Sequence, residues 1–338
     1  MPLPSKISLV FQGPVFTPEK NPKLGHLTRD CIEATRQLFP EAEIILSTWE
    51  GSLVEGIPCD RVVLNKDPGS WLRDDGGRSN VNRQIVSTRN GLAQASRPFA
   101  AKIRTDTVIT GTGFLNFARS SSDRLAKWAI FSERILILER YTRNPALLPL
   151  LHHPSDIFQF GRTDDLIYLW DIPLSTPDIN QAWHKHHPKP LLTPFPHRTI
   201  YSKCCEEQYV WLQCLRRQHP EVDLDYLWQA RLGQIFISES LLTANFIIAA
   251  AEDAGVRLPD RFVGDVHGWP ETCYRSEEWV WLTTLYQSDK HPICRRLRIL
   301  RVWLGVWWKS IWTTAKWPCE KASGWFRFHV LSRLLRKP

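Results

Sequence analysis

Three charged residues stand at alternate positions near the end of one apolar segment. The segment FAAKIRTDTVI, residues 99–109, contains Lys102, Arg104 and Asp106. A carboxylate at the end of a strand can hold a divalent cation that bridges the two phosphates of a nucleoside diphosphate. Arg104 and Lys102 would then pair with phosphate oxygens, Arg104 through its bidentate fork. The alternative is a strand end held by ion pairs without a ligand, and the spacing is compatible with both.

Two further residues are candidates for the same site. Glu207 belongs to the segment EEQYVW, at the start of a predicted helix, where the helix dipole keeps acids ionised. An ionised carboxylate beside a bound ligand can deprotonate an acceptor hydroxyl, so Glu207 is the candidate general base. An acidic first turn is equally the ordinary way to cap a helix. His267, in the segment GDVHGW, is the candidate further ligand of a cation held by Asp106.

The segment FQGPV offers a place for a nucleotide. The chain has no GxGxxG after its first predicted strand and no GxxxxGK[ST], so the usual dinucleotide and P-loop fingerprints are excluded. Gln12 and Gly13 end the first strand, and Gly13 allows the backbone to approach a ligand closely. A tight turn without a ligand explains the same residues. Arg83, on the predicted helix NVNRQIVSTRNGL, faces the ligand if that helix borders the site.

The elements that must position these residues alternate along the first hundred residues. Strands are expected in ISLVFQGPV, AEIILSTW, CDRVVLNKDPG and FAAKIRTD, and helices in LTRDCIEATRQLF and NVNRQIVSTRNGLAQAS. Short apolar strands without polar alternation predict an α/β fold with a mainly parallel sheet covered by helices on both faces. Ligands of such sheets bind beyond the carboxyl ends of the strands, which is where Gly13 and Asp106 fall. Charged groups cost less there than midway along a buried strand.

Later elements are less regular. SDIFQFGRTDDL predicts a strand to Gly161 and a helix from about Thr163, CCEEQYVWLQCLRR a helix, and residues 172–200 an irregular excursion. LTANFIIAAAEDAG is compatible with a strand followed by a helical turn or with one helix.

The charge of the chain is concentrated at its C-terminal end. Residues 289–338 hold 12 Lys or Arg against 2 Asp or Glu, whereas residues 1–288 hold 31 against 33. Leu297, Leu300, Leu304, Trp307, Trp308 and Ile311 share one side of a helical wheel, and Arg295, Arg298, Lys309 and Lys316 share the other. A basic amphipathic helix with indoles on its apolar side is typical of a helix lying on an anionic membrane. A helix packed on the body with solvated arginines is the alternative.

Composition excludes several classes of protein. A near-neutral body with a basic end is not the footprint of a protein that wraps nucleic acid. Eight cysteines without a CxxC pair indicate neither a zinc ribbon nor a disulfide scaffold. The first residues lack the features of a signal peptide, and no apolar run is long enough for a spanning helix. We therefore expect a cytoplasmic protein, peripherally associated with the inner face of a membrane.

Seven sequence blocks resemble the WavE lipopolysaccharide synthesis family. These blocks are ISLVFQGPV, FPEAEIILSTWEG, DRVVLNKDPG, NVNRQIVSTRNGL, KIRTD, PSDIFQFG and EEQYVW, and the resemblance covers residues 5–250. It implies a nucleotide-sugar-dependent glycosyltransferase with a GT-A-like fold, whose strand-end acidic motif holds Mn²⁺ or Mg²⁺. Asp106 would match the last acid of that motif and Arg104 would replace the first, where an arginine could take over part of the cation's charge neutralisation.

Together these observations predict a GT-A-like catalytic domain over residues 1–288 and a membrane-associating tail over residues 289–338. The expected reaction moves a sugar from a nucleoside-diphosphate sugar to a hydroxyl of a lipid-linked or polysaccharide acceptor. Two other functions fit the same residues: a nucleotidyltransferase that activates a sugar phosphate, and a non-catalytic scaffold at a membrane. No nucleic acid partner is expected.

Overall fold

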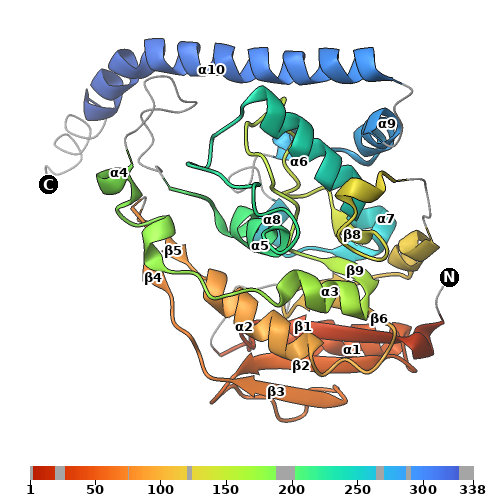
Figure 1. Ribbon diagram of the computed structural model, residues 1–338. Coiled ribbons are helices and arrows are strands. Elements are labelled where there is room, and N and C mark those ends of the chain that lie inside the picture. Colours follow the sequence, from red (N-terminus) through yellow and green to blue (C-terminus); the bar gives the residue numbers. More distant parts are fainter. Residues whose placement is uncertain are drawn as a thin grey trace, which may run out of the picture.

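The computed structural model describes residues 3–19, 27–74, 76–119, 124–187, 202–263, 270–286 and 291–326, which fold around one central sheet (Figure 1). In this part of the chain the sheet has seven strands, in the order β10-β8-β9-β6-β1-β2-β3. Their bounds are β1 (Ile7–Gln12), β2 (Glu43–Trp49), β3 (Arg61–Asn65), β6 (Phe99–Arg104), β8 (Ile135–Leu138), β9 (Gln159–Arg162) and β10 (Phe246–Ala249).

The sheet is mainly parallel, as predicted. Strands β6, β1, β2 and β3 pair in parallel, and so do β8 and β10. Strand β9 is antiparallel to both of its neighbours, β6 and β8. The carboxyl ends of the parallel strands and the beginning of β9 therefore lie at the same edge of the sheet.

Helices and short strands surround the central sheet. The helices are α1 (Thr28–Leu38), α2 (Val81–Leu92), α3 (Thr163–Trp170), α4 (Trp183–His186), α5 (Glu206–Leu215), α6 (Leu232–Asn245), α7 (Ala251–Ala254), α8 (Asp260–Val263), α9 (Ser276–Tyr286) and α10 (Pro292–Phe326). Short 3-10 helices are η1 (Pro4–Lys6), η2 (Gly113–Arg119), η3 (Ala126–Trp128), η4 (Pro177–Ile179) and η5 (Pro270–Thr272). Short strand pairs are β4 (Trp71–Leu72) with β5 (Arg78–Ser79), and β7 (Val108–Ile109) with β11 (Val256–Arg257).

Local sequence explains the central elements. All six residues of β1 are buried, as a strand covered on both faces requires. Helices α2 and α3 lie together on one face of the sheet (Figure 1). Helix α2 approaches most closely at Gly91, where an added Cβ would lie 2.6 Å from Val10 Cγ1 and 2.9 Å from Ser47 Cβ. The open choice at residues 242–255 resolves into the end of α6, then β10, then α7.

Helix α10 is packed on the body rather than free of it. It runs along the side of the molecule opposite the sheet, over α6 and α9 (Figure 1). Val302 and Val306 are buried against Leu151 and Ile235. The Arg298 guanidinium lies 3.0 Å from a carboxylate oxygen of Glu239, which is 1% exposed. Arg298, which the alternative of a packed helix left in solvent, thus fastens the helix to the core.

The carboxylate of Glu239 is the centre of a buried network. Tyr274 and Tyr286 donate their hydroxyls to its two oxygens, at 2.9 and 2.7 Å, and Arg298 also donates to Asn144 Oδ1 at 3.0 Å. Removing Arg298 would leave a buried charge without its counter-ion, which is strongly destabilising. Through these contacts, the described part of helix α10 belongs to the folded body of the protein.

The apolar side of α10 faces outward. Its exposed large apolar residues are Ile293 (71%), Leu297 (61%), Leu300 (43%), Leu304 (48%), Trp307 (48%), Trp308 (66%) and Trp312 (50%). Arg296 and Arg301 are exposed on its two flanks. Among the described residues, no helix combines the length and the apolar character that crossing a bilayer requires.

Candidate active site

A cavity of about 650 Å³ opens at the carboxyl edge of the sheet. It lies where β1 separates β2 and β3 on one side from β6 on the other, the position at which open α/β sheets bind ligands. Its lining comprises Gln12, Gly13, Pro14, Trp49, Asp67, Arg73, Arg78, Asn80, Arg83, Gln84, Ser87, Arg104, Tyr141, Asp156, Ile157, Glu206, Glu207 and Phe262. The predicted residues Gln12, Gly13, Arg83, Arg104 and Glu207 are thus brought together.

The turn after β1 exposes backbone to the cavity. Gly13 has φ 124°, a conformation that side-chain-bearing residues rarely adopt, and a Cβ there would lie 3.3 Å from Thr105 Oγ1. Thr105 in turn donates to the carbonyl of Pro14 at 2.6 Å. Gln12 is buried and accepts a hydrogen bond from Ser87 at 2.8 Å, which ties the end of β1 to α2. A glycine is therefore required at this point of the cavity wall.

Arginines line the cavity, and three of them have acidic partners. Arg83 makes a bidentate pair with Asp67, with N–O distances of 2.8 and 2.6 Å, and this pairing raises the pKa of Arg83. Arg73 lies 3.2 Å from Glu206. Arg104 is paired with Asp106 and contributes a 22% exposed side chain to the wall. Guanidinium groups in this arrangement can recognise phosphate by exchanging partners.

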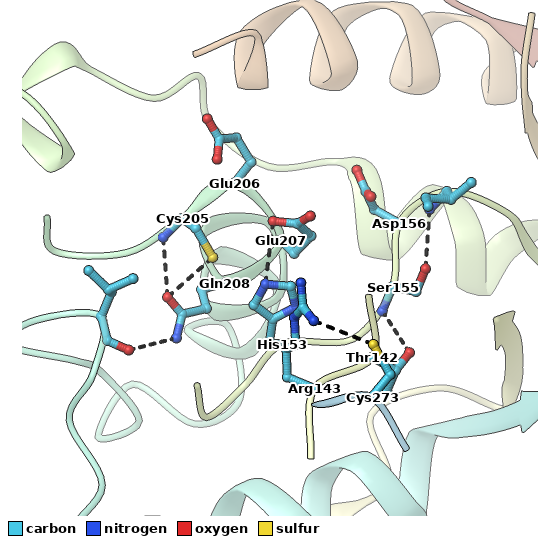
Figure 2. A network of polar contacts seen from close by, with 12 residues as sticks. Thr142, Arg143, His153, Ser155, Asp156, Cys205, Glu206, Glu207, Gln208 and Cys273 are labelled. Atoms are coloured by element: carbon cyan, nitrogen blue, oxygen red, sulfur yellow. Dashed lines mark hydrogen bonds and ion pairs between the residues drawn. The ribbon is translucent and has the colours of Figure 1, made fainter. Parts of the chain in front are cut away.

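Another part of the cavity wall is acidic. Figure 2 shows the carboxylates of Glu206, Glu207 and Asp156 around one open space, with the first two on the first turn of α5. Burial, followed by the nearby charges of Asp156 and Glu206, raises the pKa of Glu207 to about 8. Asp156 accepts a hydrogen bond from Gln84 at 2.6 Å. Glu207 is thus a carboxyl group that exchanges its proton near neutral pH, as a general base requires.

His153 lies directly beneath Glu207. Its Nε2 atom is 3.6 Å from Glu207 Oε2 (Figure 2). Burial, helped by the charge of Arg143, lowers the pKa of His153 to about 3. The imidazole is therefore neutral at physiological pH, and it gives Glu207 no charge that would lower the carboxyl pKa.

One group in the described part of the chain brings potential metal ligands close together. His153, Cys205 and Glu207 have ligand atoms within 4.8 Å of one another. Thiol and imidazole ligands suit Zn²⁺ rather than Mn²⁺ or Mg²⁺. The Cys205 thiol lies 3.4 Å from Gln208 Oε1, and this contact closes the first turn of α5. Burial raises the pKa of Cys205 well above its usual value. We interpret Cys205 as a helix cap.

Asp106 does not have the environment that was predicted. Its carboxylate is completely buried and is ion-paired with Arg104, at 3.4 Å, and with Arg261 of α8. It is absent from the lining of the cavity, so the prediction of an exposed carboxylate is wrong. Because both oxygens face guanidinium groups, a divalent cation does not fit at Asp106. His267, the other predicted ligand, lies outside the described residues.

Lys102 is also displaced from its predicted role. Its side chain is completely buried, its ammonium donates to the backbone carbonyl of Asp156, and it lies 4.9 Å from the centre of the Trp170 ring. Burial lowers the pKa of Lys102 to about 8. Lys102 does not line the cavity, and it instead holds the segment that carries Asp156.

Sequence reasoning missed several residues of the cavity. Arg73, Arg78, Gln84, Tyr141 and Asp156 line it without having been predicted. Asp156 stands three residues before β9. Because β9 is antiparallel, its beginning meets the carboxyl ends of the other strands. The apolar run IFQF after Asp156 was a detectable signal for a strand, but its direction was not.

Comparisons with known proteins bear on the family. No curated protein matches the chain. One similar solved structure is the 2-C-methyl-D-erythritol 4-phosphate cytidylyltransferase of Francisella tularensis, with 13% identity, 49% of this chain and 76% of that chain covered, and a TM-score of 0.28. The model of the WavE lipopolysaccharide synthesis family matches residues 7–315, further than the blocks in residues 5–250 and into α10. The chain therefore belongs to the WavE lipopolysaccharide synthesis family.

Proposed function

We propose that this chain transfers a sugar from a nucleoside-diphosphate sugar to a hydroxyl of lipopolysaccharide or another surface glycan. Family membership supports a transferase of lipopolysaccharide synthesis. The observation that carries the finer proposal is the cavity of about 650 Å³, which joins an arginine-lined wall to Glu207 at the ligand-binding edge of the sheet. A diphosphate requires the first feature and a hydroxyl acceptor the second.

The donor would lie across the end of β1. The Gln12–Gly13 turn lets the nucleotide contact backbone, and Arg83 and Arg104 would pair with the diphosphate oxygens. Arg104 and Arg261 together carry two positive charges against the one negative charge of Asp106, so this corner keeps a net positive charge. That surplus is available to an anionic donor.

Glu207 would act as the general base. The acceptor oxygen attacks the anomeric carbon, the bond from that carbon to the diphosphate oxygen breaks, and the nucleoside diphosphate leaves with the bonding electrons. The acceptor proton passes to Glu207. Direct attack of this kind inverts the anomeric centre. The pKa of about 8 makes Glu207 a stronger base than an ordinary carboxylate.

A requirement for Mn²⁺ or Mg²⁺ stays a prediction. Such an ion would have to be held by side chains other than that of Asp106, because that carboxylate is ion-paired with two arginines. No step of the proposed reaction depends on it. Thermal-shift measurements with and without Mn²⁺ test whether the protein binds such an ion.

The donor site is tested by nucleotide binding and product analysis. UDP, GDP, CDP and ADP are screened by thermal shift; a ligand at 100 times its dissociation constant should add about 2.7 kcal/mol of stability. Arg83→Ala should weaken binding at least tenfold. The matched control Arg61→Ala removes an arginine at the start of β3, outside the cavity lining, and should not. Release of pyrophosphate instead of a nucleoside diphosphate would assign the chain to nucleotidyl transfer.

We also propose that the chain works at the inner, cytoplasmic face of a membrane, through the outward side of α10. Its exposed leucines and tryptophans, flanked by Arg296 and Arg301, match the apolar and anionic layers of a bilayer surface. Binding to anionic vesicles should fall at least tenfold in the triple variant Leu297→Ser, Leu304→Ser, Trp308→Ser. Leu53→Ser, at a residue 64% exposed, is the control. Point variants are preferred to truncation because Glu239 needs Arg298.

A further inference from the structure

A second cavity of about 650 Å³ adjoins the candidate donor cavity. It lies at the same edge of the sheet, beyond the ends of β8 and β10, where Glu139 and Ala251 contribute to its wall. Phe262 lines both cavities. The neighbouring residues Arg140 and Tyr141 line the second and the first cavity respectively. The two hollows are therefore separated by little more than one layer of side chains.

An aromatic pair forms that layer. The rings of Tyr141 and Phe262 meet edge to face, with centres 5.8 Å apart and an angle of 89° between their planes. Tyr141 has φ 69°, which is costly for an aromatic residue. Buried Thr142 holds this turn by donating its backbone N–H to Glu139 and its hydroxyl to Leu138. Strain of this kind collects at functional sites, where it fixes a side chain in a required position.

The lining of the second cavity is mixed. Glu252 and Asp260 supply acceptors, and Arg257 supplies donors. The Glu139–Arg275 pair, at 3.4 Å, keeps a further acid and a further arginine at the wall. Val256, Leu258 and Phe262 add apolar surface. A saccharide has the complementary character, because its hydroxyls both donate and accept hydrogen bonds while its C–H faces pack on aromatic rings.

We propose that this second cavity binds the acceptor saccharide and presents its reacting hydroxyl past Tyr141 and Phe262 to Glu207. The inference rests on the proposed sugar transfer and assigns its second substrate to a place. Glu207 is close enough to Tyr141 for its charge, after burial, to help raise the pKa of the tyrosine hydroxyl. Tyr141 and Glu207 both line the donor cavity, so the candidate base borders the same space as the aromatic pair.

The test separates the two cavities by binding alone. The probe is core oligosaccharide released from bacterial lipopolysaccharide by mild acid, titrated by saturation-transfer NMR. Arg257→Ala with Glu252→Ala changes two exposed residues and should leave the fold intact. Ala251→Trp fills the cavity. Both variants should bind the oligosaccharide at least tenfold more weakly and keep the wild-type thermal shift with nucleoside diphosphates. Arg83→Ala should show the reverse pattern.

Three results would overturn the assignment: no oligosaccharide binding by the wild type, unchanged binding by both second-cavity variants, or an equal loss in Arg83→Ala. A wild-type protein that ignores every nucleoside diphosphate counts against the proposed function instead. The oligosaccharide measurements keep their meaning in that case because they require neither donor nor turnover.

Discussion

Two acids at the same edge of the sheet have opposite surroundings. Asp106, just after β6, is sealed between Arg104 and Arg261, whereas Glu207, on α5, shares its space with Asp156, Glu206 and a neutral His153. The first acid is held by counter-charges and has no open side. The second is buried beside like charges, and burial, followed by those charges, raises its pKa to about 8.

The difference teaches which acid is suited to chemistry. The charge of an acid sealed between arginines is already neutralised, and its removal would leave two guanidinium groups without their counter-ion. An acid with a raised pKa can exchange a proton near neutral pH. Glu207 and Asp106 should therefore respond in opposite ways to removal of their charge.

The largest expected effect is on catalysis. Glu207→Gln should lower the rate of sugar transfer by about 10²–10⁴-fold, because the acceptor hydroxyl loses its base. The melting temperature should not fall, because a carboxyl group crowded by like charges is replaced by a neutral one. The measurement is steady-state transfer together with thermal unfolding.

Glu206→Gln is the matched control for this variant. Glu206 stands one residue away but is paired with Arg73, so its loss should cost less than about tenfold in rate, the equivalent of one modest interaction. Equal losses in the two variants would show that the acidic wall acts as a unit and that Glu207 has no special role.

The second effect is on stability. Asp106→Asn leaves Arg104 and Arg261 facing each other without a counter-charge, and should lower the free energy of unfolding by about 3 kcal/mol. Asp60→Asn breaks the exposed pair with Arg36, in which Asp60 is 50% exposed, and should cost less than about 1 kcal/mol. Urea unfolding at pH 7 compares the two. Similar small losses would mean that Asp106 is not held as described.

The third effect is a dependence on pH. Because the folded pKa of Glu207 is raised, the folded state binds more protons than the unfolded state between about pH 4.5 and about pH 8. Glu207 therefore lowers stability progressively as the pH rises through this window. Because the folded pKa of His153 is lowered, His153 instead raises stability as the pH rises from about 3 to about 6.5. The difference in melting temperature between wild type and Glu207→Gln isolates the carboxyl, and transfer should increase toward pH 8.

The smallest effect concerns the neighbour of Glu207. Gln84→Leu removes the 2.6 Å hydrogen bond to Asp156 without adding a charge. The loss of one hydrogen bond of this kind should change the transfer rate by about threefold to tenfold. The midpoint of the pH–rate profile should shift as Asp156 moves. A profile identical to that of the wild type would indicate that Asp156 does not influence the base.

The sequence predicted the parts of this site that depend on local pattern. Apolar runs located β1, β2, β3 and β6, and the turn at Gly13 followed from its residue type. The carboxyl edge of the sheet was therefore placed correctly. Glu207 was chosen because it lies in the acidic first turn of a predicted helix, and the structure shows that this turn borders the cavity.

The rest depends on contacts between distant segments. Asp106 is sealed by Arg261, which arrives from α8, and no periodicity near Asp106 announces that partner. Asp156 enters the cavity because β9 runs against its neighbours, a direction that local pattern does not encode. Arg73 sits in an irregular loop beside the short strand β4, where neither helical nor strand spacing applies.

The buried ion pair between Arg298 and Glu239 has a consequence for the solubility of the purified protein. Because the Arg298–Glu239 ion pair is buried, α10 cannot rotate about its axis to bury its tryptophans in the core. The exposed apolar residues of α10 therefore face solvent when no lipid is present. Concentrated preparations should therefore aggregate unless a mild detergent covers these exposed residues.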